Sequence, residues 1–157
     1  MSKKLYALFA VVFAFASCNC QKPAVEENTS TKEATMNLEK LPKFEYVANT
    51  RGFYQKITIE NKIVTVSSDR EGGDKGQAVP LSDADVNELN VAIQNIKWGD
   101  LGGFKDPTQK RFYDGAAIAT LRVTINGDEY QSVDFDHGFP PVEIEKLVNK
   151  IVSFGKK

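Results

Sequence analysis

Hydrophobic and polar positions divide the chain into three parts. Twelve consecutive apolar residues run from Leu5 to Ala16, and a polar stretch without aromatic side chains then extends to Lys43. From Phe44 onward, apolar residues recur at the spacing of two that is typical of strands, or at the spacing of three to four that is typical of helices. The pattern predicts a leader, a tether and one folded domain, over residues 1–17, 18–43 and 44–157.

The first half of the domain has the alternation of antiparallel strands. Phe44–Ala48 predicts a first strand, which we place at an edge of the sheet. Phe53–Glu60 and Ile63–Ser68 predict a hairpin with a two-residue turn at Asn61-Lys62. This register puts four apolar side chains on one face of the sheet: Ile57, Ile59, Val64 and Val66.

A glycine-rich loop and a helix follow the hairpin. Asp69–Val79 lacks the Gly-Lys-Ser/Thr ending of a phosphate-binding loop, so we interpret it as a mobile surface loop. Ser82 and Asp85 have the spacing of a capping box, and we expect the helix to end at Gly99 with Trp98 in the core or at its rim. The predicted buried stripe of this helix has four members: Val86, Leu89, Ile93 and Ile96.

The second half repeats this order with another loop, hairpin and helix. We interpret Gly102–Asp114 as a solvated loop, and expect a hairpin from Ala116 with a three-residue turn near Asn126-Gly127. Pro140 and Pro141 suit the first turn of the closing helix. Its predicted buried stripe has five members: Ile144, Leu147, Val148, Ile151 and Phe154.

These elements follow one another in the order β-β-β-α-β-β-α. Hairpins with one apolar face and two amphipathic helices are typical of an α+β two-layer sandwich. Because neither hairpin requires a parallel crossover, we expect a mainly antiparallel sheet of four to five strands, packed on one face by the two helices.

Charge and cysteine content narrow the class of protein. The chain has 20 basic and 21 acidic residues, and removal of Lys3 and Lys4 with the leader leaves 18 against 21. No basic field is available to hold nucleic acid, so we expect no nucleic-acid partner. Cys18 and Cys20 are the only cysteines, too close for a disulfide framework, and we expect no metal site and no cofactor.

The leader indicates export. Twelve apolar residues rise about 18 Å as a helix, less than the hydrocarbon core of about 30 Å, so a retained membrane span is disfavoured. Ala16 and Ser17 before Cys18 resemble the lipobox of bacterial lipoproteins, although Phe15 stands where Leu is usual. We therefore expect cleavage before Cys18 and its diacylation. Cleavage after Ala16, which would give a soluble secreted protein, is the alternative.

The candidate chemistry lies at the end of the second hairpin. Regular alternation puts Asp134 and Asp136 on the outer face with Thr120 and Arg122, where two carboxylates could bind a cation or orient His137 as a general base. The same alternation sends His137 to the opposite face. We therefore favour a structural role for His137 and an ion pair between Arg122 and the carboxylates. The speculative binding set has five members: Arg51, Arg122, Asp134, Asp136 and His137.

The domain resembles small Bacteroidota-type lipoproteins of unknown function over roughly Phe44 to Phe154. The resemblance is to general pattern, and it implies the location of the protein without bringing a catalytic residue. The stretches that carry it are Phe44-Glu45-Tyr46, Thr50-Arg51-Gly52, Phe53-Tyr54-Gln55-Lys56-Ile57, Asp114-Gly115-Ala116 and Asp136-His137-Gly138 before Pro140-Pro141.

The sequence as a whole favours a lipid-anchored binding or interaction module rather than an enzyme. We expect it at the cell membrane or the outer membrane, facing the periplasm or the cell surface, with the bilayer as one partner through Cys18 and an envelope protein as another. Two alternatives stay open: a hydrolase or metal-dependent site around Asp134, Asp136 and His137, and a structural envelope protein.

Overall fold

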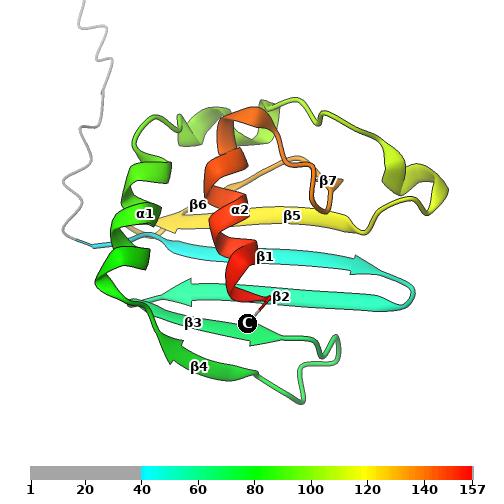
Figure 1. Ribbon diagram of the computed structural model, residues 1–157. Coiled ribbons are helices and arrows are strands. Elements are labelled where there is room, and N and C mark those ends of the chain that lie inside the picture. The colour runs from blue at the N-terminus through cyan, green and yellow to red at the C-terminus, as the bar shows by residue number, and fades with distance from the viewer. Residues whose placement is uncertain (1–39, 157) are drawn as a thin grey trace, which may run out of the picture. The chain divides into compact units, whose positions relative to one another are not determined.

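A computed structural model describes residues 40–156 of the chain. They form an α+β fold, as predicted, in which one antiparallel sheet has the strand order β4-β3-β2-β1-β5-β6, with β7 pairing beside β6 on the same side of β5 (Figure 1). The strands are β1 (Lys43–Thr50), β2 (Phe53–Glu60), β3 (Ile63–Ser67), β4 (Gln77–Pro80), β5 (Ile118–Ile125), β6 (Asp128–Gln131) and β7 (Phe135–Asp136).

Two α-helices lie side by side across one face of this sheet (Figure 1). They are α1 (Asp83–Ile93) and α2 (Glu145–Phe154). Three short 3-10 helices complete the described part: η1 (Trp98–Gly103), η2 (Lys110–Tyr113) and η3 (Val142–Ile144). Neither α-helix covers the opposite face, so the sheet has one buried face and one open face.

The first hairpin has the predicted register. Ile59 pairs with Val64 and Ile57 with Val66. Asn61 and Lys62 both have positive φ, at 51° and 61°, which is the backbone twist that a two-residue turn needs between right-twisted strands. Lys62 adopts it despite having a side chain, because the strand pairing on both sides fixes the turn.

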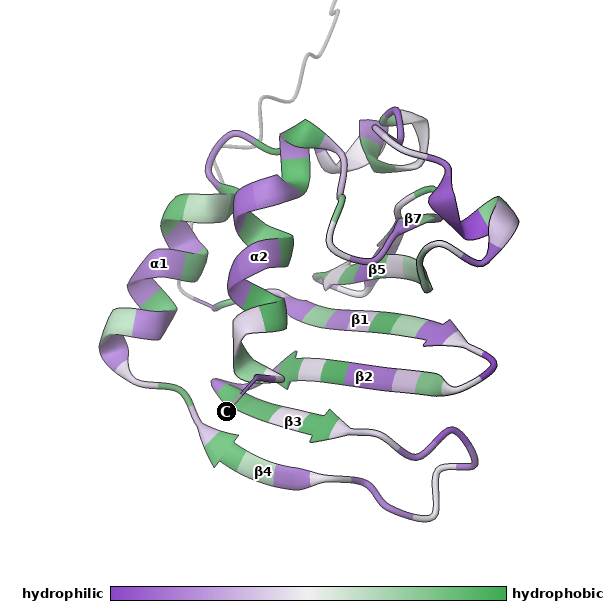
Figure 2. Ribbon diagram, turned by 45° about the vertical axis from the view of Figure 1, so that its right-hand side comes forward, coloured by the Kyte–Doolittle hydropathy of each residue, from purple (hydrophilic) through white to green (hydrophobic). Residues whose placement is uncertain are grey.

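The predicted stripes are mostly buried. Of the first stripe, Leu89, Ile93 and Ile96 are buried and Val86 is half-buried, with Ile96 beyond the end of α1. All five members of the second stripe are buried, four in α2 and Ile144 in η3, and α1 begins with the predicted capping box between Ser82 and Asp85. The predicted end of α1 at Gly99 is wrong, since the helix ends at Ile93. Trp98 instead begins η1, with 7 % of its surface exposed, so it belongs to the core. Along both helices, hydrophobic and hydrophilic residues alternate in Figure 2.

Two predictions about the first strands are wrong. β1 is central, because β2 pairs on one side of it and β5 on the other. Leu41 is already buried, so the domain begins a few residues before Phe44. One edge of the sheet is formed by β4, in which the glycine-rich segment ends. This extra strand, with the division of the last predicted strand into β6 and β7, raises the count to seven, above the four to five expected.

The second hairpin differs from the prediction at its turn. Ile125 pairs with Asp128, so Asn126-Gly127 is a two-residue turn with positive φ at both residues. The register then slips by one residue, since Val123 pairs with Tyr130 but Ala119 with Phe135. This is a β-bulge, and it restores Phe135 to the buried face without a longer turn.

Ser132 accounts for the bulge. Its amide donates to the carbonyl of Leu121 at 2.9 Å, and the amide of Leu121 donates to its side-chain Oγ at 3.0 Å. The hydroxyl therefore satisfies a buried backbone donor where the regular ladder stops. The slip decides on which side Asp134 and Asp136 lie.

Candidate functional site

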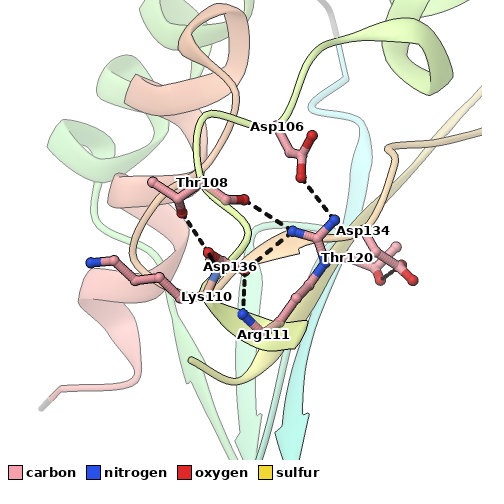
Figure 3. A network of polar contacts seen from close by, with 7 residues as sticks. All are labelled: Asp106, Thr108, Lys110, Arg111, Thr120, Asp134 and Asp136. Carbon is pink, nitrogen blue, oxygen red and sulfur yellow. Dashed lines mark hydrogen bonds and ion pairs between the residues drawn. The ribbon is translucent and has the colours of Figure 1, made fainter. Parts of the chain in front are cut away.

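Asp136 is the centre of a buried polar network that ties η2 to β7 (Figure 3). Its carboxylate is fully buried and accepts hydrogen bonds from the backbone amides of Lys110 at 2.6 Å and Arg111 at 3.0 Å, and from the Thr108 hydroxyl. The Arg111 guanidinium lies 3.2 Å from Asp136 and 2.8 Å from Asp106. The loop predicted to be solvated is therefore held to the sheet by a buried ion pair.

The ionisation of Asp136 follows from these donors. Burial raises the pKa of the carboxyl, but the hydrogen bonds from Thr108, Arg111 and Lys110 outweigh burial and lower the pKa to about 2. A carboxylate that accepts four hydrogen bonds on its two oxygens has a structural role. It has no lone pair directed at solvent for a general base.

Asp134 lies on the same face of the sheet as Asp136 but outside the network around η2. It is exposed, and it accepts a hydrogen bond from Thr120 at 2.8 Å. Arg122 pairs with Glu45 at 3.2 Å and Glu129 at 3.0 Å, not with the two aspartates. The prediction that the aspartates share the outer face with Thr120 agrees with the pairing, since Asp136 lies opposite Ile118 and Asp134 bonds to Thr120. The prediction that Arg122 neutralises them is wrong, because Arg122 pairs with glutamates of neighbouring strands.

His137 faces the core side of the sheet. A hydrogen bond of 2.6 Å joins its Nδ1 to the hydroxyl of Tyr46, and the ring of Phe53 lies 5.4 Å from the imidazole between centroids. Burial and then the charge of Lys156 lower the pKa of His137, while burial raises that of Tyr46, so both are neutral near pH 7. Arg51 is exposed in the turn between β1 and β2.

Tyr46→Phe should lower the free energy of unfolding by about 1 kcal/mol, because it removes one half-buried hydrogen bond and keeps the ring. Urea unfolding at pH 7 measures this loss. Tyr54→Phe is the matched control, since Tyr54 lies on the open face and its hydroxyl makes no hydrogen bond within residues 40–156, and it should change stability little. Equal losses in both variants would argue against a structural role for the Tyr46–His137 pair.

The five residues of the predicted binding set therefore do not form one site. Asp136 faces η2, His137 faces Tyr46, and Arg122 lies on the open face. Across residues 40–156, no group of three or more His, Cys, Asp or Glu side chains is placed to hold a metal ion. The geometry gives no support to a hydrolytic or metal-dependent centre around these residues.

The open face of the sheet is polar and carries ion pairs between strands. A chain of charges crosses four strands: Lys56 lies 2.9 Å from Glu45, Glu45 lies 3.2 Å from Arg122, and Arg122 lies 3.0 Å from Glu129. Thr58 pairs directly with Thr65 on the same face. This face presents charged and hydroxyl groups to solvent, unlike the aliphatic face under the helices.

One end of the open face is hollowed where the loop after β3 meets β2 and β3. The hollow has a volume of about 320 Å³. Strand residues form its floor, and loop residues form its rim. The lining residues are Tyr54, Lys56, Thr58, Thr65, Ser67, Asp69, Arg70, Gly72, Asp74 and Lys75.

The rim is a loop with many internal hydrogen bonds, in the segment that the sequence predicts to be a mobile surface loop. The Asp69 carboxylate accepts hydrogen bonds from the amides of Glu71 at 2.8 Å and Asp74 at 2.7 Å, and these bonds lower its pKa. The Ser67 hydroxyl donates to the carbonyl of Asp74 at 2.7 Å. Arg70 donates to the carbonyl of Thr50, which ties the loop to the end of β1. The loop therefore closes on itself.

The hollow is not predicted from the sequence, although one part of it follows from the strand pattern. The predicted hairpin register already places Thr58 opposite Thr65 and Lys56 opposite Ser67 on the polar face. The return of the loop over that face could not be predicted. It depends on the hydrogen bonds that the Asp69 carboxylate accepts and the one that the Ser67 hydroxyl donates, which no local sequence pattern predicts.

Comparisons with family models, curated proteins and solved structures found no match. The resemblance to small lipoproteins stays a prediction. The leader, Cys18 and most of the tether lie outside the described residues. Within residues 40–156, no helix is long and apolar enough to cross a membrane.

Proposed function

We infer that this protein is a lipid-anchored binding module of the cell envelope, and that it binds through the open face of its sheet. The observation that carries this proposal is the hollow at the end of that face, formed by strand side chains and an ordered loop. Lipid attachment at Cys18 would hold the domain at a membrane, on either the periplasmic or the cell-surface side.

The contrast between the two faces of the sheet supports a binding role. The helix-covered face is filled by aliphatic and aromatic side chains that stabilise the fold, with Phe44, Ile57 and Leu121 fully buried. The open face contributes little to that core, yet it carries ordered ion pairs and a shaped hollow. Ligand sites combine such a concave surface with a few placed polar groups. An enzymatic role has no comparable constellation in the described part of the chain.

Photo-crosslinking in producing cells tests where the protein binds. A photoreactive residue at Thr65, on the floor of the hollow, should give adducts with an envelope component. The same residue at Asn149, on the exposed side of α2, should give few. Equal labelling from both positions, or none from either, would contradict binding through the open face.

Cys18→Ser should release the protein from the membrane fraction, since a serine cannot carry the thioether-linked diacylglycerol. The expected result is uncleaved precursor or soluble protein in place of the membrane-bound form. Cell fractionation and mass spectrometry of the N-terminal peptide measure it. Cys20→Ser is the matched control and should leave the fractionation unchanged. Membrane retention of Cys18→Ser equal to that of the parent chain would argue against acylation at Cys18.

A further inference from the structure

We propose that the hollow on the open face binds an acidic saccharide, a sugar unit that carries a carboxylate. This assignment rests on the proposed binding role of the open face and names the ligand class. It follows from three properties of the lining: the number of free donors, the way in which the acidic side chains are occupied, and the size of the hollow.

Hydroxyl groups form the floor of the hollow. Thr58 and Thr65 are cross-strand partners on the open face, and Tyr54 lies further along the same strand as Thr58. Within residues 40–156 these three hydroxyls make no hydrogen bond to other groups, so they are available to a ligand. A hydroxyl both donates and accepts, which matches the hydroxyls of a sugar ring.

The charged groups of the hollow favour an anion. Three cationic side chains and two acidic ones line it, although the whole chain has a net charge of −1. Both carboxylates are engaged by backbone amides of the loop: Asp69 by Glu71 and Asp74, and Asp74 by Gly76 at 2.8 Å. Lys75 has no ion pair within the described part of the chain. Of the other lining cations, Lys56 is paired with Glu45 and Arg70 donates to Thr50, so Lys75 is the cation left to pair with an anion.

The size of the hollow favours a ligand larger than a simple anion. Its volume of about 320 Å³ lies at the lower end of small-molecule sites, which run from about 300 to 1,000 Å³. Successive side chains on one face of a strand are about 7 Å apart. The floor from Tyr54 to Thr58 thus spans five residues of β2, about 14 Å, which gives room for a ring with hydroxyls on several edges.

Nuclear magnetic resonance titration of the full mature chain tests the assignment, with sodium glucuronate, glucose and sodium acetate as probes. Glucuronate should shift the backbone amides of residues 56–58, 65–67 and 70–76 in a saturable way, and glucose and acetate should each bind at least tenfold more weakly. If acetate bound as strongly as glucuronate, the sugar ring would not be recognised and the ligand would not be a saccharide. If glucose bound as strongly as glucuronate, the carboxylate would not be recognised and the ligand would not need to be acidic.

Two substitutions locate the contacts. Lys75→Gln should weaken glucuronate binding about tenfold, because a charge-assisted hydrogen bond is replaced by a neutral one. Thr58→Val should weaken it several-fold while keeping the strand, since the two side chains have nearly the same shape. Lys146→Gln removes the same charge from the exposed side of α2 and should leave binding unchanged. Equal weakening in Lys146→Gln would mean that glucuronate responds to net charge alone, which contradicts the site.

The failure of this assignment is distinguishable from the failure of the proposed function. If Thr65 crosslinks to an envelope component while glucuronate causes no shifts, the open face is a binding surface but the ligand is not an acidic saccharide. If neither experiment gives a signal from the open face, both proposals are overturned.

Discussion

Asp136→Ala should lower the free energy of unfolding by about 3–5 kcal/mol, the largest loss expected from any single polar side chain of the domain. The carboxylate is fully buried, and its removal leaves the amides of Lys110 and Arg111 without their acceptor. The guanidinium of Arg111 also loses one of its two partners. Since small domains are stable by only about 5–15 kcal/mol, urea unfolding should show a large shift of the midpoint.

Asp134→Ala is the control for this prediction. Asp134 stands two residues away, is exposed and accepts one hydrogen bond, from Thr120. Its replacement should change the free energy of unfolding by less than about 1 kcal/mol. Comparable losses in the two variants would mean that the buried contacts with η2 and Arg111 do not distinguish Asp136 from Asp134, which contradicts the stabilising role of this network.

The acid dependence of stability should report on the same carboxylate. The pKa of Asp136 is about 2 in the folded state and 3.8 by its ordinary value, so the folded state holds the proton less tightly. The stabilisation is therefore fully present above about pH 4 and is lost as the pH falls toward 2. Asp85 has a similarly lowered pKa and adds to the total. Between pH 5 and pH 2, the free energy of unfolding measured with urea should fall less steeply in Asp136→Asn than in the parent chain. Equal slopes would contradict the lowered pKa of Asp136.

The sequence predicts the fold class because its strongest signals are local. The alternation that puts Ile57, Ile59, Val64 and Val66 on one face needs only a two-residue turn, and the stripe of α2 needs only helical spacing. The central place of β1 could not be predicted, since it depends on pairing with β5, about 70 residues later in the chain. Nothing in the strand itself distinguishes an edge from a centre.

The candidate site was less accessible to prediction, for a related reason. Asp134 and Asp136 alternate regularly with Val133 and Phe135, so they appear equivalent along the sequence. The segment that packs over Asp136, with donors from Thr108, Lys110 and Arg111, breaks this equivalence because it buries Asp136 and leaves Asp134 exposed. The rim of the hollow likewise depends on the amides that donate to the Asp69 carboxylate. The backbone conformation of the loop, not its amino-acid composition, determines which amides these are.

Gly76→Ala should dismantle the rim of the hollow and lower the free energy of unfolding by about 2–4 kcal/mol, from a strained backbone and an overpacked contact together. Gly76 has a φ of +76°, and an added Cβ would lie 1.9 Å from the carbonyl oxygen of Val66. That oxygen belongs to a strand in the middle of the ladder and cannot move freely. The loop and β4 must shift instead, which should speed hydrogen exchange of the β4 amides and abolish the glucuronate shifts.

Gly72→Ala is the control that separates the backbone strain of a positive φ from the steric clash of an added Cβ. Gly72 has nearly the same φ, +77°, but no atom lies within 4 Å of an added Cβ. It should therefore cost only the strain of the left-handed backbone, about 1–2 kcal/mol, and should leave exchange in β4 unchanged. If Gly72→Ala and Gly76→Ala destabilise the domain equally, the close approach of Gly76 to Val66 is not what holds the loop over the open face. The rim would then have to be held by Asp69 and Arg70 alone, and the hollow should survive in both variants.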